Sequence, residues 1–432
     1  MRKTTFCLAI ILLCACNSWG ASAIVKIREP QLIPATPALS LADCINLALK
    51  NQPSIRTAQA QAYGQAGAVL QSQAGLLPGI SASASTEVAG DQPGGPVQIT
   101  FSGNQLIYDF GGTAAKVAGA RHTESSDILN ESAVAANVVL SVKQAYYTFL
   151  EDTHLVDVYK ENLADQQAHV AETQAQEAAG TAPHTNVLTA QAAASSAQFD
   201  LVTAQNTANI ARINLNSAMG VDIRSPIQIA ETSEPETPVP TQDDAVNLAL
   251  TRRPEIRRDV QQVLAARAGV KASSVGDLPT VSGSADYSPN SRTNAFGQSQ
   301  SSTQTQVLLN LQWSPIDFGA TRGAIQQARA QVLTAEETLY SDKETVATQT
   351  AQALLNVTAG EAQLASANAE VASAQQNLDA AVGSYQAGIG IFLSVIDAQA
   401  ALLKAEVDEY TARYGLSIAR AQLQQATGEV TP

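Results

Sequence analysis

The chain has 432 residues and a formal net charge of −14. Hydrophobic residues make up 45% of it but aromatic residues only 5%, and much of the apolar content is alanine. Alanine is the best helix former and adds little apolar area to a core, so the composition predicts long helices in thin layers and disfavours a thick globular core. The acidic balance disfavours a nucleic-acid partner.

The first 23 residues have the pattern of an export signal. Arg2 and Lys3 precede a short apolar run, and Ala21-Ser22-Ala23 fits the small-residue cleavage site that follows such a run. Leu13-Cys14-Ala15-Cys16 resembles a lipobox, so a lipid-modified Cys16 is the alternative to cleavage after Ala23. Cleavage after Ala23 changes the formal charge from −14 to −16 and leaves one cysteine, Cys44. That excludes a disulfide framework and a cysteine metal site.

The two halves of the chain carry the same motifs in the same order. A Leu-Ala-Leu segment precedes both Pro53 and Pro254, which are 201 positions apart. Asp109-Phe110-Gly111 matches Asp317-Phe318-Gly319, now 208 positions apart. We therefore predict an internal tandem structural repeat of residues 24–222 and 242–432, joined by a Pro-rich connection at 223–241.

Each half is predicted to contain the same elements in the same order. In the first half these are a short helix at 40–51, a helix from Pro53 to about 76, a strand pair at about 79–108, a long helix at about 112–179 and a return helix at 183–219. In the second half they are a short helix at 242–252, a helix from Pro254 to about 276, a strand pair at about 280–314, a long helix at about 319–387 and a return helix at 391–427. No proline occurs from Val97 to Ala182 or from Ile316 to Thr431. About 67 helical residues span about 100 Å, and such a helix buries its apolar stripe only in a bundle or a coiled coil.

All four predicted strands alternate apolar with small polar residues. Val97, Ile99 and Phe101, for example, alternate with Gln98, Thr100 and Ser102. This is typical of an outer-membrane barrel with an apolar lipid face and a polar lumen, where Glu87 and Asp286 face inward; a soluble sheet with one wet face is the alternative. Polar loops at 90–96 and 289–302 join the strands. Tyr108, Trp313 and Phe318 lie at strand ends, where interfacial aromatics are expected.

Four strands are too few to close a barrel in one chain, because about eight is the practical minimum. Three protomers would supply twelve strands. No segment after the signal has the ~18–20 uninterrupted apolar residues of a transmembrane helix. A periplasmic coiled-coil adaptor or scaffold is the alternative to a channel, but it gives no reason for four lipid-compatible strands.

The repeated motifs resemble those of the TolC-type outer-membrane efflux channel family, from about Leu39 to Gly428. The most specific segment runs from Tyr385 through Gly388 to Gln399, and a weaker partner runs from Gly180 to Gln191. The resemblance implies a mainly α fold with a trimeric twelve-stranded transmembrane β-barrel, four strands per protomer, continued by a long periplasmic α-helical barrel. It also implies an equatorial belt that uses about 218–252 and both chain ends.

The resemblance further implies positions for functional residues at the periplasmic end. The entrance or gate would use Asp397, Ser394, Tyr385, Asn186 and Thr185. Asp397 matches an acidic ring, whereas Ser394 replaces a second acidic residue, and Asn186 replaces the frequent acidic partner of Tyr385. Gly180, Gly388 and Gly390 would form the helix-hairpin tips that dock an adaptor.

No catalytic constellation, phosphate loop or dinucleotide fingerprint is visible, so we expect no enzyme activity, no cofactor and no metal site. His122, His154, His169 and His184 are scattered along helices without metal-ligand spacing, and we expect them at the surface.

The function implied is a passive outer-membrane conduit, extending into the periplasm, of a tripartite efflux or type I secretion system that exports small molecules or protein. Its partners would be two further copies of the chain, outer-membrane lipid, a periplasmic adaptor and an inner-membrane pump of RND or ABC type. The sequence does not identify the exported substrate or the pump class.

Overall fold

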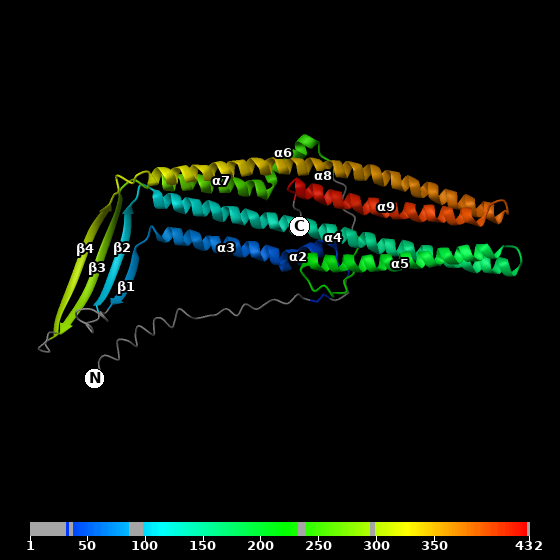
Figure 1. Ribbon diagram of the computed structural model, residues 1–432, viewed down its shortest axis with the longest axis horizontal. Helices are drawn as coiled ribbons and strands as arrows, with labels where there is room; N and C mark the ends of the chain where they lie inside the picture. The colour runs from blue at the N-terminus through cyan, green and yellow to red at the C-terminus, as the bar shows by residue number, and fades with distance from the viewer. Residues whose placement is uncertain (1–31, 34–37, 86–97, 232–237, 294–298, 430–432) are drawn as a thin grey trace.

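Figure 1 shows the computed structural model of the chain, in which residues 32–33, 38–85, 98–231, 238–293 and 299–429 are described. Two layers of long helices run side by side, and a four-stranded sheet stands at one end, inclined to the helices (Figure 1). The expected signal peptide at 1–23 with Cys16, the inward-facing Glu87 and the loop at 90–96 lie outside the described residues.

The same order of elements occurs twice along the chain. The first half contains α2 (Leu41–Asn51), α3 (Pro53–Ala74), β1 (Gly79–Ser85), β2 (Gln98–Tyr108), α4 (Gly112–Ala178) and α5 (His184–Met219). The second half contains α6 (Gln242–Arg252), α7 (Pro254–Ser273), β3 (Thr280–Thr293), β4 (Ser299–Gln312), α8 (Ala320–Gln386) and α9 (Phe392–Ala426). The long helices α4 and α8 have 67 residues each, which corresponds to about 100 Å.

Local sequence signals account for the helix starts. Pro53 and Pro254 occupy the first turn of α3 and α7, where the missing N–H would have no helical partner in any case. Ser40 caps α2 by accepting a hydrogen bond from the backbone N–H of Asp43 at 3.2 Å. Among the described residues, no helix contains an 18-residue stretch that is apolar enough to cross a membrane.

The four strands pair in the order β1-β2-β3-β4, and every pairing is antiparallel, so the contact between β2 and β3 joins the two halves of the chain. The register places Ala82, Phe101 and Tyr287 in one row across the sheet. The neighbouring row contains Ser102 and Asp286. Because successive side chains point to opposite faces, the sheet has one mainly apolar and one mainly polar face.

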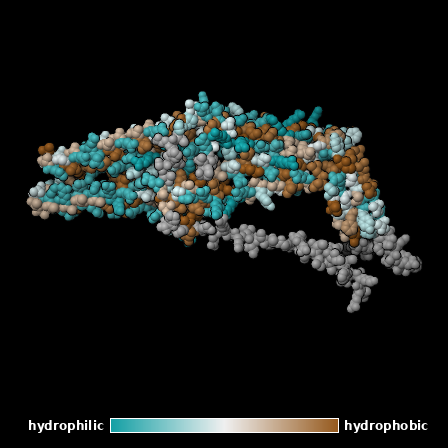
Figure 2. Space-filling view, turned by 180° about the vertical axis from the view of Figure 1, so that it is seen from behind, coloured by the Kyte–Doolittle hydropathy of each residue, from teal (hydrophilic) through white to brown (hydrophobic). Residues whose placement is uncertain are grey.

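The apolar face is uncovered in the single chain. Val307, Leu309 and Leu311 are 76%, 73% and 66% exposed. Figure 2 shows brown, hydrophobic residues gathered at the sheet and where the helices meet it, while the helices are more mixed. An exposed apolar patch of this kind marks contact with a membrane or with another protein.

A repeated Asp-Phe-Gly turn leads from each strand pair into the long helix. The Asp109 carboxylate accepts hydrogen bonds from the N–H groups of Gly111 and Thr113 at the start of α4. Asp317 repeats both contacts with the corresponding N–H groups at the start of α8. These N–H groups have no partner inside the helix, so each aspartate caps its long helix.

The phenylalanine of each turn has a left-handed backbone. The φ angles are 55° at Phe110 and 52° at Phe318, and both side chains are exposed. A residue with a Cβ atom pays about 1–2 kcal/mol for this conformation. Each of the two turns therefore holds one strained phenylalanine at the junction of the sheet and the helices.

The central helix is α4, which packs against α3, α5, α7 and α9, while α8 packs against α6, α7 and α9. The largest core lies near the helix midpoints and includes Tyr146, Leu215 and Met219, all fully buried. Ile227, from the chain after α5, is buried in the same core. The Tyr146 hydroxyl donates a hydrogen bond to the carbonyl oxygen of Ala230. The described part of the connection at 223–241 is thus packed on the helices; residues 232–237 lie outside it.

Candidate functional site

The two helix hairpins, α4–α5 and α8–α9, reverse at the end of the molecule farthest from the sheet (Figure 1). Gly180 and Gly388 stand at the reversals with φ of 73° and 75°. In the first hairpin, Gly180 N–H donates to Glu177 O and Thr181 N–H to Gln176 O, both at 2.9 Å. The second hairpin repeats this pair of bonds, which is the Schellman ending of a helix and favours glycine at the left-handed residue.

Gly390 is required for a different reason. A Cβ atom at this position would lie 3.0 Å from the backbone nitrogen of Tyr385 and 3.1 Å from the carbonyl carbon of Ser384. Its N–H donates to the Ser384 carbonyl at 2.9 Å. The second tip is therefore closed tightly on the end of α8.

The second tip exposes apolar side chains. Ile389 and Ile391 are 83% and 65% exposed, and Leu393 is also exposed, whereas Phe392 between them is buried. These residues were not predicted from the sequence, although a run of isoleucine, phenylalanine and leucine around a tight turn is unusual where turns are otherwise polar. An exposed apolar cap at the end of a long hairpin is suited to contact another protein.

The expected gate residues lie on three helices, α5, α8 and α9, near these tips. Asp397 and Ser394 are exposed on α9, one turn apart. Thr185 is exposed and Asn186 is half-buried in the first turn of α5. The hydroxyl of Tyr385 donates to Gln176 Oε1 on α4 at 2.7 Å, so its partner in this structure is Gln176 and not Asn186.

A second polar contact joins α4 to α9, farther from the hairpin tip than the contact of Tyr385. Gln166 Nε2 donates to Gln399 Oε1 at 3.0 Å, and Gln399 Nε2 lies 2.8 Å from Nε2 of His169. The Phe392 ring contacts both His169 and Tyr385. The distance between ring centroids is 5.9 Å to His169 and 5.7 Å to Tyr385. Both glutamines are buried, so the contact is shielded from water and specifies how α4 and α9 align.

These polar residues were missed in the sequence, yet a signal exists. Gln166, His169, Thr173 and Gln176 follow one another along α4 at spacings of three, four and three. That spacing places them on one helix face, and the structure turns this face toward the second hairpin. The sequence therefore contains a polar stripe at the spacing of a buried helix face, but it does not show which residues of the second hairpin these side chains contact.

The expectation that all four histidines are surface residues is wrong for three of them. His184 is exposed, whereas His122, His154 and His169 are half-buried. His122 Nδ1 lies 2.9 Å from Gln261 Oε1, and the His154 ring stacks on Tyr410 with 5.1 Å between ring centroids. Among the described residues, no group of three histidine, cysteine, aspartate or glutamate side chains is placed to hold a metal ion.

Comparison with known proteins adds three observations. The model of the family described as "Outer membrane efflux protein" matches residues 44–221 and 245–429. Protein CyaE of Bordetella pertussis is 28% identical over 344 residues, which are 75% of this chain and 70% of CyaE. The outer-membrane channel OprN has a similar structure, with a TM-score of 0.77 and 18% identity over 90% of this chain and 89% of that chain.

The outer membrane channel CmeC of Campylobacter jejuni is also similar, with a TM-score of 0.78 and 16% identity over 90% of this chain and 85% of that chain. At these identities the structural likeness concerns the fold. It confirms the predicted fold class, in which a small antiparallel sheet continues into long paired helices.

Proposed function

This chain belongs to the outer membrane efflux protein family, and we propose that it is the passive outer-membrane conduit of a tripartite export system. The protein lies in the outer membrane and extends into the periplasm, as its family does. In this proposal the energy for transport comes from a partner protein.

Homotrimer formation belongs to the same proposal. The four strands of one chain leave an uncovered apolar face and cannot close a barrel, because closure takes about eight strands. Three copies would supply twelve strands for one shared barrel and a matching cylinder of long helices.

The apolar second tip is the observation that carries the docking assignment. Ile389, Ile391 and Leu393 are exposed at the end of a helix of about 100 Å that starts at the sheet. The tip is thus the part of the chain that reaches farthest from the outer membrane. We assign to it the contact with a periplasmic adaptor, which in turn connects to an inner-membrane pump of RND or ABC type.

The gate is assigned to the same end of the molecule. Asp397 and Ser394 would face the pore axis, while Tyr385 lies in the last turn of α8 and Asn186 and Thr185 lie in the first turn of α5. The hydrogen bonds from Tyr385 to Gln176 and between Gln166 and Gln399 would hold the second hairpin against α4 in the closed state.

Envelope fractionation and cross-linking test these assignments. We expect a heat-modifiable trimer in the outer-membrane fraction, and a photo-cross-linker in place of Ile389 should capture the adaptor, while one in place of Leu355 on the exposed side of α8 should not. A soluble periplasmic monomer would favour the alternative, a coiled-coil adaptor or scaffold. Export assays in a strain without the protein, with drugs, metals and secreted protein as cargo, would identify the substrate class.

A further inference from the structure

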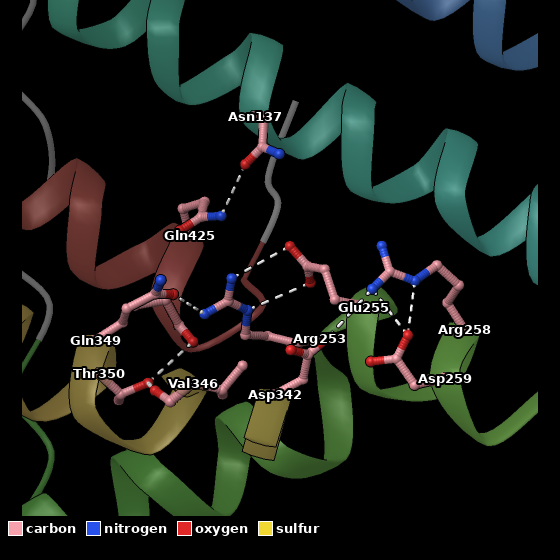
Figure 3. Close-up of polar contacts among 11 residues, drawn as sticks. Asn137, Arg253, Glu255, Arg258, Asp259, Asp342, Val346, Gln349, Thr350 and Gln425 are labelled. Carbon is pink, nitrogen blue, oxygen red and sulfur yellow. Dashed lines mark hydrogen bonds and ion pairs between the residues drawn. The ribbon is translucent and has the colours of Figure 1, made fainter. Parts of the chain in front are cut away.

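The contact between α7 and α8 contains two aspartates at positions that face a neighbouring helix. Figure 3 shows these residues, with Asp259 on α7 and Asp342 on α8 on either side of Arg258. Along α7 the buried positions are Ile256, Asp259 and Val263, at spacings of three and four. Asp259 is 1% exposed, and Ile256 packs against Val346 of α8 in an apolar cluster. A carboxylate at the centre of such a contact is unusual, since ionised side chains are almost never fully buried unless paired.

The first half of the chain does without these aspartates. With the offsets of 201 and 208 residues, Ala58 corresponds to Asp259 and Val134 corresponds to Asp342. Ala58 is buried between α3 and α4, and Val134 packs against the apolar core there. The same helix contact therefore forms with apolar side chains, and the fold does not require the two carboxyl groups.

The hydrogen bonds around the aspartates leave one acceptor unmatched. Arg258 Nε donates to Asp259 Oδ1 at 2.8 Å, and Arg258 Nη2 donates to Asp342 Oδ2 at 3.4 Å. Asp259 Oδ2 is buried and accepts no hydrogen bond among the described residues. An unpaired buried carboxylate oxygen is costly, so a donor is missing at this point.

The neighbouring charged groups cannot supply that donor. Arg253, which immediately precedes α7, binds Glu255 and donates to Gln349 Oε1 at 2.8 Å. On the α4 side, His122 lies against Gln261, two residues beyond Asp259. Lys343 and Glu344, next to Asp342 on α8, are exposed. Arg258 is thus shared between two carboxyl groups, those of Asp259 and Asp342.

Electrostatics favour the acid form of one carboxyl group. Burial raises the pKa of Asp259, the Asp342 carboxyl acts in the same direction, and Arg258 opposes both without cancelling them. The Asp259 carboxyl is buried and that of Asp342 is 35% exposed. Two like charges side by side at such a site are unfavourable, whereas a carboxylic acid facing a carboxylate forms a hydrogen bond.

We propose that Asp259 and Asp342 form a proton-binding site, in which one proton is shared between the two carboxyl groups and supplies the missing hydrogen bond. The proton belongs to the pair, and its loss leaves two negative charges beside one arginine between α7 and α8. The second half of the chain therefore has a helix contact that responds to pH, and the first half has the same contact without that response.

Infrared spectroscopy of the purified trimer tests the site directly. In a pH series that rises from about 4, above the ordinary aspartate pKa near 3.9, we expect a protonated carboxyl band that the wild type keeps to higher pH than variants without the pair. The band should be weaker in Asp259→Asn and in Asp342→Asn, because these variants lose the shared proton but keep other carboxyl groups with raised pKa, such as Glu406. It should persist in the control Glu337→Gln, which removes an exposed carboxylate from the same helix α8. A protonated carboxyl band of equal intensity in the wild type and in both asparagine variants over the whole pH series would overturn the proposal.

Thermal unfolding gives a second, independent readout. A carboxyl whose pKa is raised in the folded state contributes stability that is complete below the unfolded value of 3.8 and is lost as pH rises through the folded pKa. The double variant Asp259→Ala, Asp342→Val copies the first half of the chain and should fold. Relative to this variant, the wild-type midpoint should fall as pH rises above about 4. Parallel pH profiles for the two proteins would contradict a shared proton.

Discussion

Asp397 lies on the exposed side of α9, one turn from Ser394. In the proposed trimer it would occur three times around one axis. Three carboxylates around a narrow gap attract cations. The basic residue two turns farther along the same helix, Lys404, already pairs with Asp408 and Glu370, so it is poorly placed to neutralise Asp397.

We predict that Asp397→Ala weakens block of the current by a divalent or polyamine cation added on the periplasmic side. The loss should be at least tenfold, or about 1.4 kcal/mol, measured as the blocking constant in planar bilayers. Ser394→Asp is the matched gain-of-charge variant and should strengthen the block. Equal block in the wild type and Asp397→Ala would place this carboxylate on the outer face of the helices.

The aspartates that cap α4 and α8 provide a prediction about acid stability. Partial burial acts to raise the pKa of Asp109, but hydrogen bonds from Thr113 and Gly111 outweigh it and lower the pKa. The corresponding bonds from Thr321 and Gly319 lower the pKa of Asp317 to about 2. A lowered carboxyl pKa stabilises the fold above the unfolded value of 3.8, and this stabilisation is lost as pH falls from 3.8 toward about 2.

Asp109→Ala should therefore destabilise the protein at neutral pH by about 1 kcal/mol, which is typical for the loss of a helix cap. Unfolding midpoints of the wild type and of the double variant Asp109→Ala, Asp317→Ala should converge as the solution is acidified below 3.8. A constant difference down to about pH 2 would show that neither carboxylate caps its helix in the ionised form.

The two helix-hairpin tips reverse through the same backbone motif, with a left-handed glycine at each turn. A leucine at Gly388 would be strained at a φ of 75°, and it would add bulk at the assigned docking surface. We predict that Gly388→Leu and Gly180→Leu abolish export but leave trimers in the outer membrane. Export is measured as substrate efflux from cells, and trimers are measured by heat-modifiable gel mobility.

Gly383→Leu is the control for these tip variants. Gly383 lies within α8, a little more than one turn before Gly388, and a Cβ atom there would have nothing within 4 Å. It therefore receives the same added side chain without left-handed strain, and export should continue. Normal export by both tip variants would remove the tips from the docking site.

Negative charge is distributed over the whole molecule. The formal charge is −14 and would become −16 on the expected cleavage after Ala23. Asp286 lies in the polar row of the sheet with Ser102. Where α4 faces α9, burial and the nearby carboxylates of Glu161 and Glu409 raise the pKa of Glu406, which shows how densely acidic groups gather there.

We predict from this distribution that the open pore prefers cations, because carboxylate-lined pores select them. Reversal potentials under a salt gradient in planar bilayers measure the preference. Clear anion preference at neutral pH would contradict it, and a variant with Asp286→Asn should shift the reversal potential toward zero if that carboxylate faces the lumen.

The sequence by itself determined the elements of this protein. Apolar spacing of three and four defined the long helices, alternation indicated the strands, and Pro53, Gly180 and the Asp-Phe-Gly turns defined where elements begin and end. The loop expected at 289–302 was too long, because β3 continues to Thr293 and β4 begins at Ser299, where the polar sequence does not show the pairing. These signals are local, because periodicity, proline geometry and left-handed glycine act within a few residues. The repeat boundaries at 24–222 and 242–432 remain predictions.

The tertiary structure alone decided which distant residues meet. Gln176 is the partner of Tyr385, Gln399 is the partner of Gln166, and Asp342 lies beside Asp259. Sequence comparison of the two halves could show aspartates where the first half has Ala58 and Val134, but not that they share one arginine. The physical reason is that side-chain pairing across helices depends on the rotation and register of each helix against its neighbours, which packing sets over the whole bundle.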